Sequence, residues 1–142
     1  MLEMLKRMVR GEAPPAPVAS LVGFTLTSIE PGQSVIEFEA DARHANPMGT
    51  LHGGILCDVA DAAMGTAYAA TLDDGETFTT LEMKINFLKP VWRGKLRAKG
   101  RVVKKGQTVG LAACDVTDAD GSLVAHATST CLTLRGDDAR GR

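Results

Sequence analysis

The chain has 142 residues, which is the size of one ordinary domain with a full hydrophobic core. Hydrophobic residues make up 44% and charged residues 23%, a balance that excludes a disordered chain, a collagen-like chain and a membrane-spanning protein. The net charge of -1 offers no basic surplus, so no nucleic-acid partner is expected. The cysteines are too few for a disulfide framework and predict buried thiols in a reducing compartment: Cys57, Cys114 and Cys131.

Residues 1–17 predict an N-terminal helix followed by a Pro-rich connector. Leu2, Leu5, Met8 and Val9 recur at helical spacing with basic residues between them, the pattern of a short amphipathic helix. We expect this helix to pack on its own domain, although the pattern also suits a partner or a membrane surface. Charged residues interrupt it, so it is no signal peptide, and no run reaches the ~18 apolar residues of a spanning helix. The expected location is the cytoplasm, without a membrane partner.

The rest of the chain predicts two strands, one helix and four more strands. Apolar and polar residues alternate as in half-buried strands over residues 24–29, 36–41, 81–87, 95–102, 108–116 and 123–134. The segment 55–71 is long enough for a helix and apolar nearly all round, which indicates a buried helix. Short turns between the last strands predict an antiparallel meander. We therefore expect one α+β domain over residues 1–142, a sheet of about six strands curled around one central buried helix, with a frayed tail at 135–142.

The junction before this helix is the most informative place for chemistry. His52, Gly53 and Gly54 precede the helical segment, and glycines leave room for a ligand to approach the backbone. A helix N-terminus has unpaired N–H groups and a partial positive charge, so it suits an anion or an oxygen that becomes anionic during a reaction. A bare Gly-Gly pair is more often only a tight turn, but here His52 precedes it and an acid follows within the helix.

That acid is Asp61, which stands among alanines in the predicted buried helix. A carboxylate there has few local partners, so burial raises its pKa or costs several kcal/mol. Asp58 lies three residues earlier on nearly the same helical face, where it would raise the apparent pKa of the pair. For Asp58 a solvent-exposed position is the favoured reading, whereas for Asp61 we favour a function.

Three strings of residues carry a resemblance to a known family. The first is Asn46-Pro47-Met48-Gly49-Thr50-Leu51-His52-Gly53-Gly54 with Asp61 in the Ala-rich helix, and the others cover residues 85–90 and 104–108. Together they resemble the hotdog-fold acyl-CoA thioesterases of the phenylacetate-degradation (PaaI-like) type, over roughly residues 20–134. The resemblance implies the hotdog fold, in which an antiparallel sheet wraps around one central helix.

The resemblance also implies hydrolysis of acyl-CoA thioesters to a free acid and CoA, with no cofactor and no metal. In such enzymes the backbone N–H at the position of Gly53 polarises the thioester carbonyl, and the acid at the position of Asp61 attacks it or activates a water. Asn46 holds a water or the carbonyl, His52 positions the thioester, and Thr80 assists the acid. An oxyanion donor and a carboxylate are a sufficient set for this reaction, since a thiolate leaves readily.

CoA carries phosphates, which need cations. Candidate CoA-binding residues stand near predicted strand ends, where Gly106 would also allow close backbone approach: Lys89, Pro90, Val91, Arg93, Lys104, Lys105, Gly106, Gln107 and Thr108. For any single lysine, a solvated surface position is an equally good reading. The acyl group, aryl or medium-chain, is not identified by the sequence.

The spacing of the two catalytic candidates predicts a site shared between two chains. Gly53 and Asp61 in one helix lie about 12 Å apart along its axis, too far to act on one carbonyl. Two antiparallel helices in a two-fold dimer place Gly53 of one chain against Asp61 of the other. The resemblance implies the same arrangement, often as a dimer of dimers, that is, a homotetramer.

Other readings of the same residues stay open at this point. Cys57 with His52 or His44 could form a nucleophile–base pair, although a buried inert thiol is favoured. A metal site at His52, Asp58 and Asp61 lacks any standard ligand spacing. The chain could also be a non-catalytic acyl-CoA-binding protein or a hotdog hydroxyacyl-thioester dehydratase. His126, on the last predicted strand, is expected to be structural.

Overall fold

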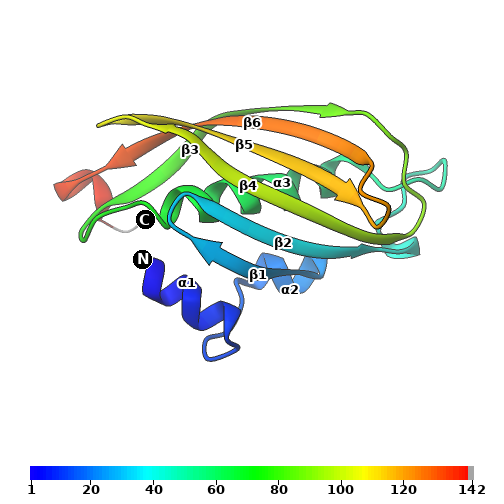
Figure 1. The fold of residues 1–142 in the computed structure, drawn as a ribbon, viewed down its shortest axis with the longest axis horizontal. Coiled ribbons are helices and arrows are strands. Elements are labelled where there is room, and N and C mark those ends of the chain that lie inside the picture. Colours follow the sequence, from blue (N-terminus) through cyan, green and yellow to red (C-terminus); the bar gives the residue numbers. More distant parts are fainter. Residues whose placement is uncertain (141–142) are drawn as a thin grey trace.

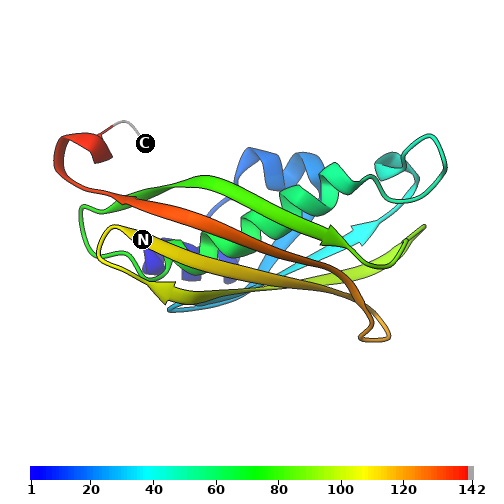
Figure 2. The same cartoon turned by 90° about the horizontal axis from the view of Figure 1, so that it is seen from above.

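The computed structural model describes residues 1–140 and has one antiparallel sheet with a long helix on its inner face (Figure 1). The helix α3 spans Gly53–Ala69. The strands are β1 (Phe24–Glu30), β2 (Gln33–Ala40), β3 (Thr77–Phe87), β4 (Gly94–Lys105), β5 (Val109–Asp118) and β6 (Leu123–Leu134). Figure 2 shows α3 lying lengthwise along the sheet. The predicted α+β architecture, a sheet of six strands around one central helix, is confirmed.

The order of the strands differs from the predicted meander in one respect. The sheet runs β1-β2-β4-β5-β6-β3, so β3 pairs with β6 and forms an edge instead of pairing with β4. Residues 88–93 cross the end of the β5–β6 hairpin to reach β4. The N–H groups of Leu88 and Lys89 donate to the carbonyl of Val124, and the N–H of Leu51 donates to the carbonyl of Val91. These long-range bonds hold the crossing in place, and no local sequence pattern encodes them.

The inner side of α3 packs unusually close to the sheet. Val59, Ala60, Ala63 and Met64 on this side have no exposed surface. A Cβ built on Gly100 of β4 would overlap the backbone carbonyl of Ala63, so this position needs glycine. The small side chains therefore allow the helix backbone to contact the strand backbone, and the density of the interior leaves no spare volume there.

The N-terminal residues form two short helices beyond the edge strand β1 (Figure 1, blue). The first helix is α1 (Leu2–Val9), and its Leu5 is buried in a cluster with Ile29, Ala69 and Ala70. The amphipathic helix thus packs on its own fold. The predicted connector up to residue 17 ends earlier, because Pro17 begins a second helix, α2 (Pro17–Val22). Proline is well tolerated at the first helical position, where its missing N–H has no bond to make.

The opposite end of the chain leaves the sheet after β6. The predicted frayed tail contains a short 3-10 helix, Gly136–Ala139, and Arg135 donates to a carboxylate oxygen of Glu76 at 2.7 Å. Residues 141 and 142 of that predicted tail lie outside the described residues. Within residues 1–140, no helix has the length and apolar character needed to cross a membrane.

Candidate active site

The N-terminus of α3 presents one unpaired backbone donor. His52 caps the helix, since its Nδ1 accepts a hydrogen bond from the N–H of Gly54 at 2.9 Å, and its carbonyl accepts from the N–H of Ile55. Among the described residues the N–H of Gly53 has no acceptor. A Cβ on Gly53 would lie 2.9 Å from the ring of Phe87, and one on Gly54 would lie 3.0 Å from Nδ1 of His52. The glycines thus fit a crowded helix start and leave a donor at its positive end.

Asn46 shapes the loop that leads to this helix. Its Oδ1 accepts from the N–H groups of Met48 at 2.9 Å and Thr50 at 3.2 Å, and its Nδ2 donates to the Thr50 hydroxyl at 2.8 Å. One N–H of the amide is left over. Asn46, Gly53, Phe87 and neighbouring residues line a cavity of about 410 Å³. The side chain therefore has a structural task, with one donor remaining for a ligand in this cavity.

Asp61 lies on α3 eight residues after Gly53, on the side of the helix that the sheet does not cover. The Thr80 hydroxyl of β3 donates to its Oδ1 at 3.4 Å, so the structure brings the two predicted residues together. Although the carboxylate is open to solvent on one side, the protein around it desolvates it and raises its pKa. The Thr80 hydrogen bond opposes this rise in pKa and the charge of Asp58 adds to it.

A bulge in β3 explains why Thr80 faces the helix. The pairing with β6 shifts register between Thr80 and Glu82. Phe78 and Thr80 face α3 before the bulge, and Met83 packs on the core after it, so Leu81 is 56% exposed. The sequence pattern had placed Leu81 on the inner face with Met83. A bulge re-aims the side chains that flank it, and here it directs a hydroxyl to the acid.

Within one chain the two candidates, the Gly53 N–H and the Asp61 carboxylate, remain apart. A straight helix places Gly53 and Asp61 about 12 Å apart along its axis. They also line different cavities: Gly53 lines the small one at the helix start, and Asp61 lines a larger groove toward the helix end. A single chain therefore does not bring Gly53 and Asp61 to one cavity.

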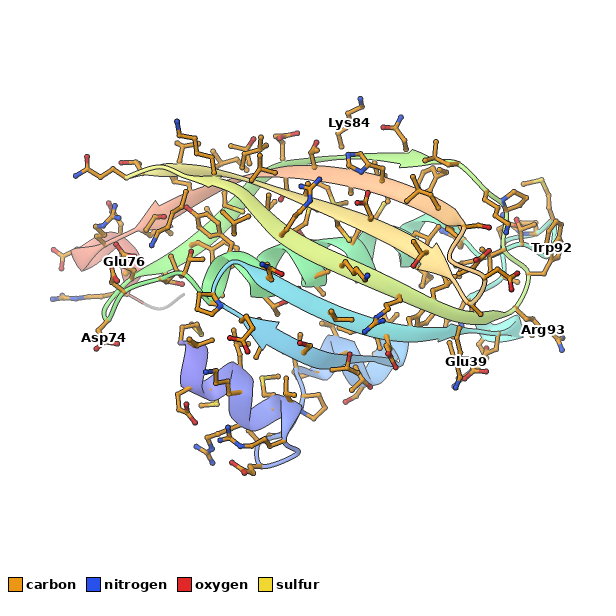
Figure 3. The ribbon with its side chains drawn as sticks, in the orientation of Figure 1. Glu39, Asp74, Glu76, Lys84, Trp92 and Arg93 are labelled. Carbon is orange, nitrogen blue, oxygen red and sulfur yellow. The ribbon has the colours of Figure 1, made fainter. Side chains whose placement is uncertain are left out.

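The predicted CoA-binding residues are also divided between two ends of the molecule. Lys89, Pro90 and Val91 line the cavity that holds Gly53, and Figure 3 shows Arg93 at the same end. Residues 104–108 comprise the end of β4 and the turn to β5. They lie at the other end of the molecule, because β4 begins near Arg93, has 12 residues and spans about 40 Å. All of these residues do lie near strand ends, but one chain does not bring them together at one place.

The cations differ in how freely they could meet a phosphate. Lys89 forms an ion pair with Asp118 at 2.5 Å, which lowers the pKa of that carboxyl. Lys105 donates to the carbonyl of Thr71 and lies 3.6 Å from Glu76. No ion pair of Arg93 occurs within residues 1–140, and beside it Trp92 is 60% exposed (Figure 3). No sequence motif singles out Trp92, although a tryptophan next to an arginine between two predicted strands is a usable signal.

The alternative chemistries find little support in the structure. Burial, with the charges of Asp58 and Asp61, raises the pKa of the Cys57 thiol, which disfavours the reactive thiolate. The His44 ring is buried and bonded to the carbonyl of Val22 and the N–H of Asp41. Residues 1–140 contain no group of three His, Cys, Asp or Glu side chains placed to hold a metal. The His126 Nδ1 lies 2.6 Å from Asp115 on the outer face of the sheet.

Comparison with known proteins decides the family. Residues 48–125, more than half of the chain, match the family model of the thioesterase superfamily. The chain belongs to the thioesterase superfamily. The matched region includes Gly53, Asp61 and Thr80, and it makes the chain a thioester hydrolase, as the sequence motifs implied.

The relatives of this thioesterase agree in sequence and in fold. It is 37% identical over 108 residues to a protein of Saccharolobus solfataricus, covering 76% of each chain. It is 31% identical over 108 residues to the human protein named acyl-coenzyme A thioesterase 13, covering 75% of this chain and 76% of that one. A phenylacetic acid degradation-related protein of Ralstonia eutropha JMP134 aligns with a TM-score of 0.82 and 34% identity, covering 91% of this chain and 98% of the other. The E. coli PaaI protein, at 21% identity, shares the fold with a TM-score of 0.84, covering 95% and 96%. The predicted hotdog fold and the PaaI-like resemblance are confirmed.

Proposed function

We propose that this thioesterase hydrolyses acyl-CoA thioesters, with Gly53 as the oxyanion donor and Asp61 as the nucleophile or general base. The observation that carries the proposal is the state of Asp61: a desolvated carboxylate bonded by Thr80 on a helix whose first N–H is unpaired. The human relative named acyl-coenzyme A thioesterase 13 supports acyl-CoA as the substrate class. No cofactor takes part in this reaction.

The chemistry follows from the two groups. The thioester carbonyl oxygen accepts the Gly53 N–H, which stabilises the negative charge that develops on that oxygen. The ionised carboxylate of Asp61 attacks the carbonyl carbon or removes a proton from a water that attacks it. The carbon–sulfur bond then breaks. If Asp61 attacked directly, the acyl group is left on its carboxylate as a mixed anhydride, and a water hydrolyses this anhydride to the free acid; if water attacked, the free acid forms at once. The CoA thiolate takes up the proton that the water loses. In both routes Asp61 must be ionised. His52 fixes the start of the helix, and the remaining Asn46 N–H donates to the water or to the carbonyl.

The proposal includes a dimer in which each site takes Gly53 from one chain and Asp61 from the other. The uncovered side of α3 supports it, because Gly54, Asp58 and Asp61 there are exposed and leave room for a second helix. The edge strand β3 offers a second element for pairing, and its Leu81 is exposed. A two-fold axis between two antiparallel α3 helices creates two equal sites.

A dimer of dimers would also reconcile the two groups of CoA-binding candidates. Lys89, Pro90, Val91 and Arg93 adjoin the Gly53 cavity of their own chain, and Lys104–Thr108 would reach the CoA of a neighbouring chain. We further expect the enzyme to act in the cytoplasm, because Cys57, Cys114 and Cys131 are all unpaired thiols.

The test is thiol release from a panel of acyl-CoA substrates, followed with a thiol reagent. Turnover of at least one acyl-CoA supports the proposal. A change in enoyl absorbance without thiol release would instead indicate the dehydratase, and binding without either signal would indicate a non-catalytic acyl-CoA-binding protein.

A further inference from the structure

A groove of about 970 Å³ leads away from Asp61 along α3. One wall is the helix face that contains Asp61, Gly65 and Ala69, spaced four residues apart. These positions span about 12 Å from the acid to the far end of the wall. Phe78 and Thr80 of β3 also line the groove. The acid and its hydrogen-bond donor therefore open onto a long channel rather than onto a compact pocket.

The opposite wall comes from the N-terminal segment, defined here as residues 1–20. Met1, Met8 of α1, the linking residues 11–16 and Val18 of α2 all contribute to it. The segment is fixed to the fold by Leu5, which is buried against β1 and the end of α3. This wall lies outside residues 48–125, the region that matches the thioesterase family model. The match to the family model therefore does not define the residues of this wall.

The groove is lined mainly by apolar atoms, and its polar groups are largely occupied. Glu12 is paired with Arg10 at 2.8 Å, and the Thr66 hydroxyl donates to the carbonyl of Ala62 at 2.7 Å. Thr80 donates to Asp61 at the groove mouth. A ligand with buried hydroxyl groups would leave them unpaired here, which is unfavourable. A straight hydrocarbon chain fits both the shape and the polarity.

We infer that this groove holds the acyl chain of the substrate, and that the N-terminal segment sets the preferred chain length. The inference rests on the proposed acyl-CoA hydrolysis and names its substrate class: unbranched acyl groups of medium length, in place of hydroxylated aryl groups. The carbonyl carbon sits at Asp61, and the chain extends along Gly65 toward Ala69. Each further methylene that enters the groove raises kcat/KM by about fourfold, until the groove is filled.

The experiment measures kcat/KM for butyryl-, octanoyl- and dodecanoyl-CoA with the full-length protein and three variants. Gly65→Ala narrows the groove, because a Cβ there lies 3.3 Å from the ring of Phe78. Met8→Ala removes part of the N-terminal wall. Met4→Ala is its matched control, since Met4 lies on the same helix, is 51% exposed and does not line the groove.

The expected result is a fall in the ratio of dodecanoyl to butyryl kcat/KM, about tenfold for Gly65→Ala and about fourfold or more for Met8→Ala. The ratio for Met4→Ala stays at the wild-type value. If Met8→Ala unfolds, Gly65→Ala still tests the inference. This variant is expected to fold, because alanine favours the helix more than glycine does. Unchanged ratios in folded Gly65→Ala protein would overturn the inference and leave thioester hydrolysis intact. Higher wild-type kcat/KM for hydroxybenzoyl-CoA than for octanoyl-CoA would overturn the substrate class. Thiol release from no acyl-CoA would overturn the proposed function itself.

Discussion

The two sides of α3 use small residues for different purposes. On the inner side, Ala60 and Ala63 have no exposed surface, and the Ala63 carbonyl contacts β4 where Gly100 leaves space. On the outer side, Ala62 and Gly65 flank a groove that begins at Asp61. The same composition thus gives tight packing on one side and open space on the other.

This difference separates stability from chemistry along one helix. Substitutions on the inner side should change the free energy of unfolding, because packed interiors tolerate no added volume. Substitutions on the outer side should change kinetic constants with little change in stability. The predictions below test whether the two sides are separable in this way.

The largest effect is expected for Asp61→Asn on the outer side. Loss of the catalytic carboxylate should lower kcat by roughly 10²- to 10⁴-fold, measured by thiol release. The folded protein raises the pKa of Asp61, which means that it disfavours the ionised carboxylate. Asp61 therefore contributes to the free energy of unfolding only as the pH falls through its folded pKa and the carboxyl group becomes protonated. The Asp61→Asn variant, whose amide carries no charge, should therefore be at least as stable as wild type at pH 7. Near-wild-type kcat would transfer the role of the acid to Asp58.

The next effect concerns stability and the inner side. Gly100→Ala places a methyl group against the backbone carbonyl of Ala63 and should cost roughly 3 kcal/mol of unfolding free energy. Gly65→Ala, on the outer side of the same helix, is the matched substitution and should cost much less, because its Cβ meets only the side chain of Phe78, at 3.3 Å, and alanine favours the helix. Urea denaturation of both variants measures the difference. Equal stability of the two variants would show that the sides of α3 are not distinct.

A smaller effect is expected for Thr80→Ala on the pH profile. The Thr80 hydrogen bond favours the ionised form of Asp61 and lowers its pKa, so removing it should raise that pKa further. The acidic limb of kcat/KM against pH should then move to higher pH, with a modest loss of rate at high pH. Thr79→Ala is the control, because adjacent strand residues point to opposite faces. If the acidic limb does not move, Thr80 does not stabilise the ionised form of Asp61.

The smallest effect is expected for the CoA-binding cations. Arg93→Gln and Lys104→Gln should each raise KM for an acyl-CoA by about 3- to 10-fold with little change in kcat, since phosphate contacts are alike in ground and transition states. The matching pantetheine thioester lacks the nucleotide and should show no rise in KM. A rise with both substrates would place the residue outside the nucleotide site.

Local pattern in the sequence predicted most of the fold. The alternation along β4 and β6 and the apolar segment of α3 placed these elements, because side-chain period and burial are local properties. The edge position of β3 could not be predicted, since its pairing with β6 joins residues far apart in the chain. The bulge near Thr80 could not be predicted either. Apolar and polar residues alternate regularly from Leu81 to Phe87, and the bulge is visible only in the register of β3 against β6.

The candidate site was predictable in composition but not in layout. The motif identified Gly53, Asp61 and Thr80 as candidate site residues. In the structure the Thr80 hydroxyl donates to Asp61, whereas Gly53 of the same chain lies away from both. The wall formed by Met8 and its neighbours carries no motif, because an apolar groove depends on packing between distant segments. The separation of Lys104 from Lys89 likewise depends on which strands pair.

The central claim, a site shared between two chains, needs a variant that removes the Gly53 N–H. Gly53→Pro does so at the first helical position, where proline is tolerated, and His52 already has the extended backbone that precedes proline, with φ -66° and ψ 132°. Gly53→Ala is the control, because it adds a Cβ and keeps the N–H. We expect Gly53→Pro to be inactive and Gly53→Ala to retain more activity.

The most direct measurement is subunit mixing of Asp61→Asn with Gly53→Pro. Each variant alone should be inactive, and the two are unfolded together and refolded at equal concentration. A mixed dimer then has one site with both lesions and one with neither, so activity should return to about a quarter of the wild-type level. If the refolded mixture stays inactive while mixed dimers are shown to form, each site lies within one chain and the shared-site account is wrong.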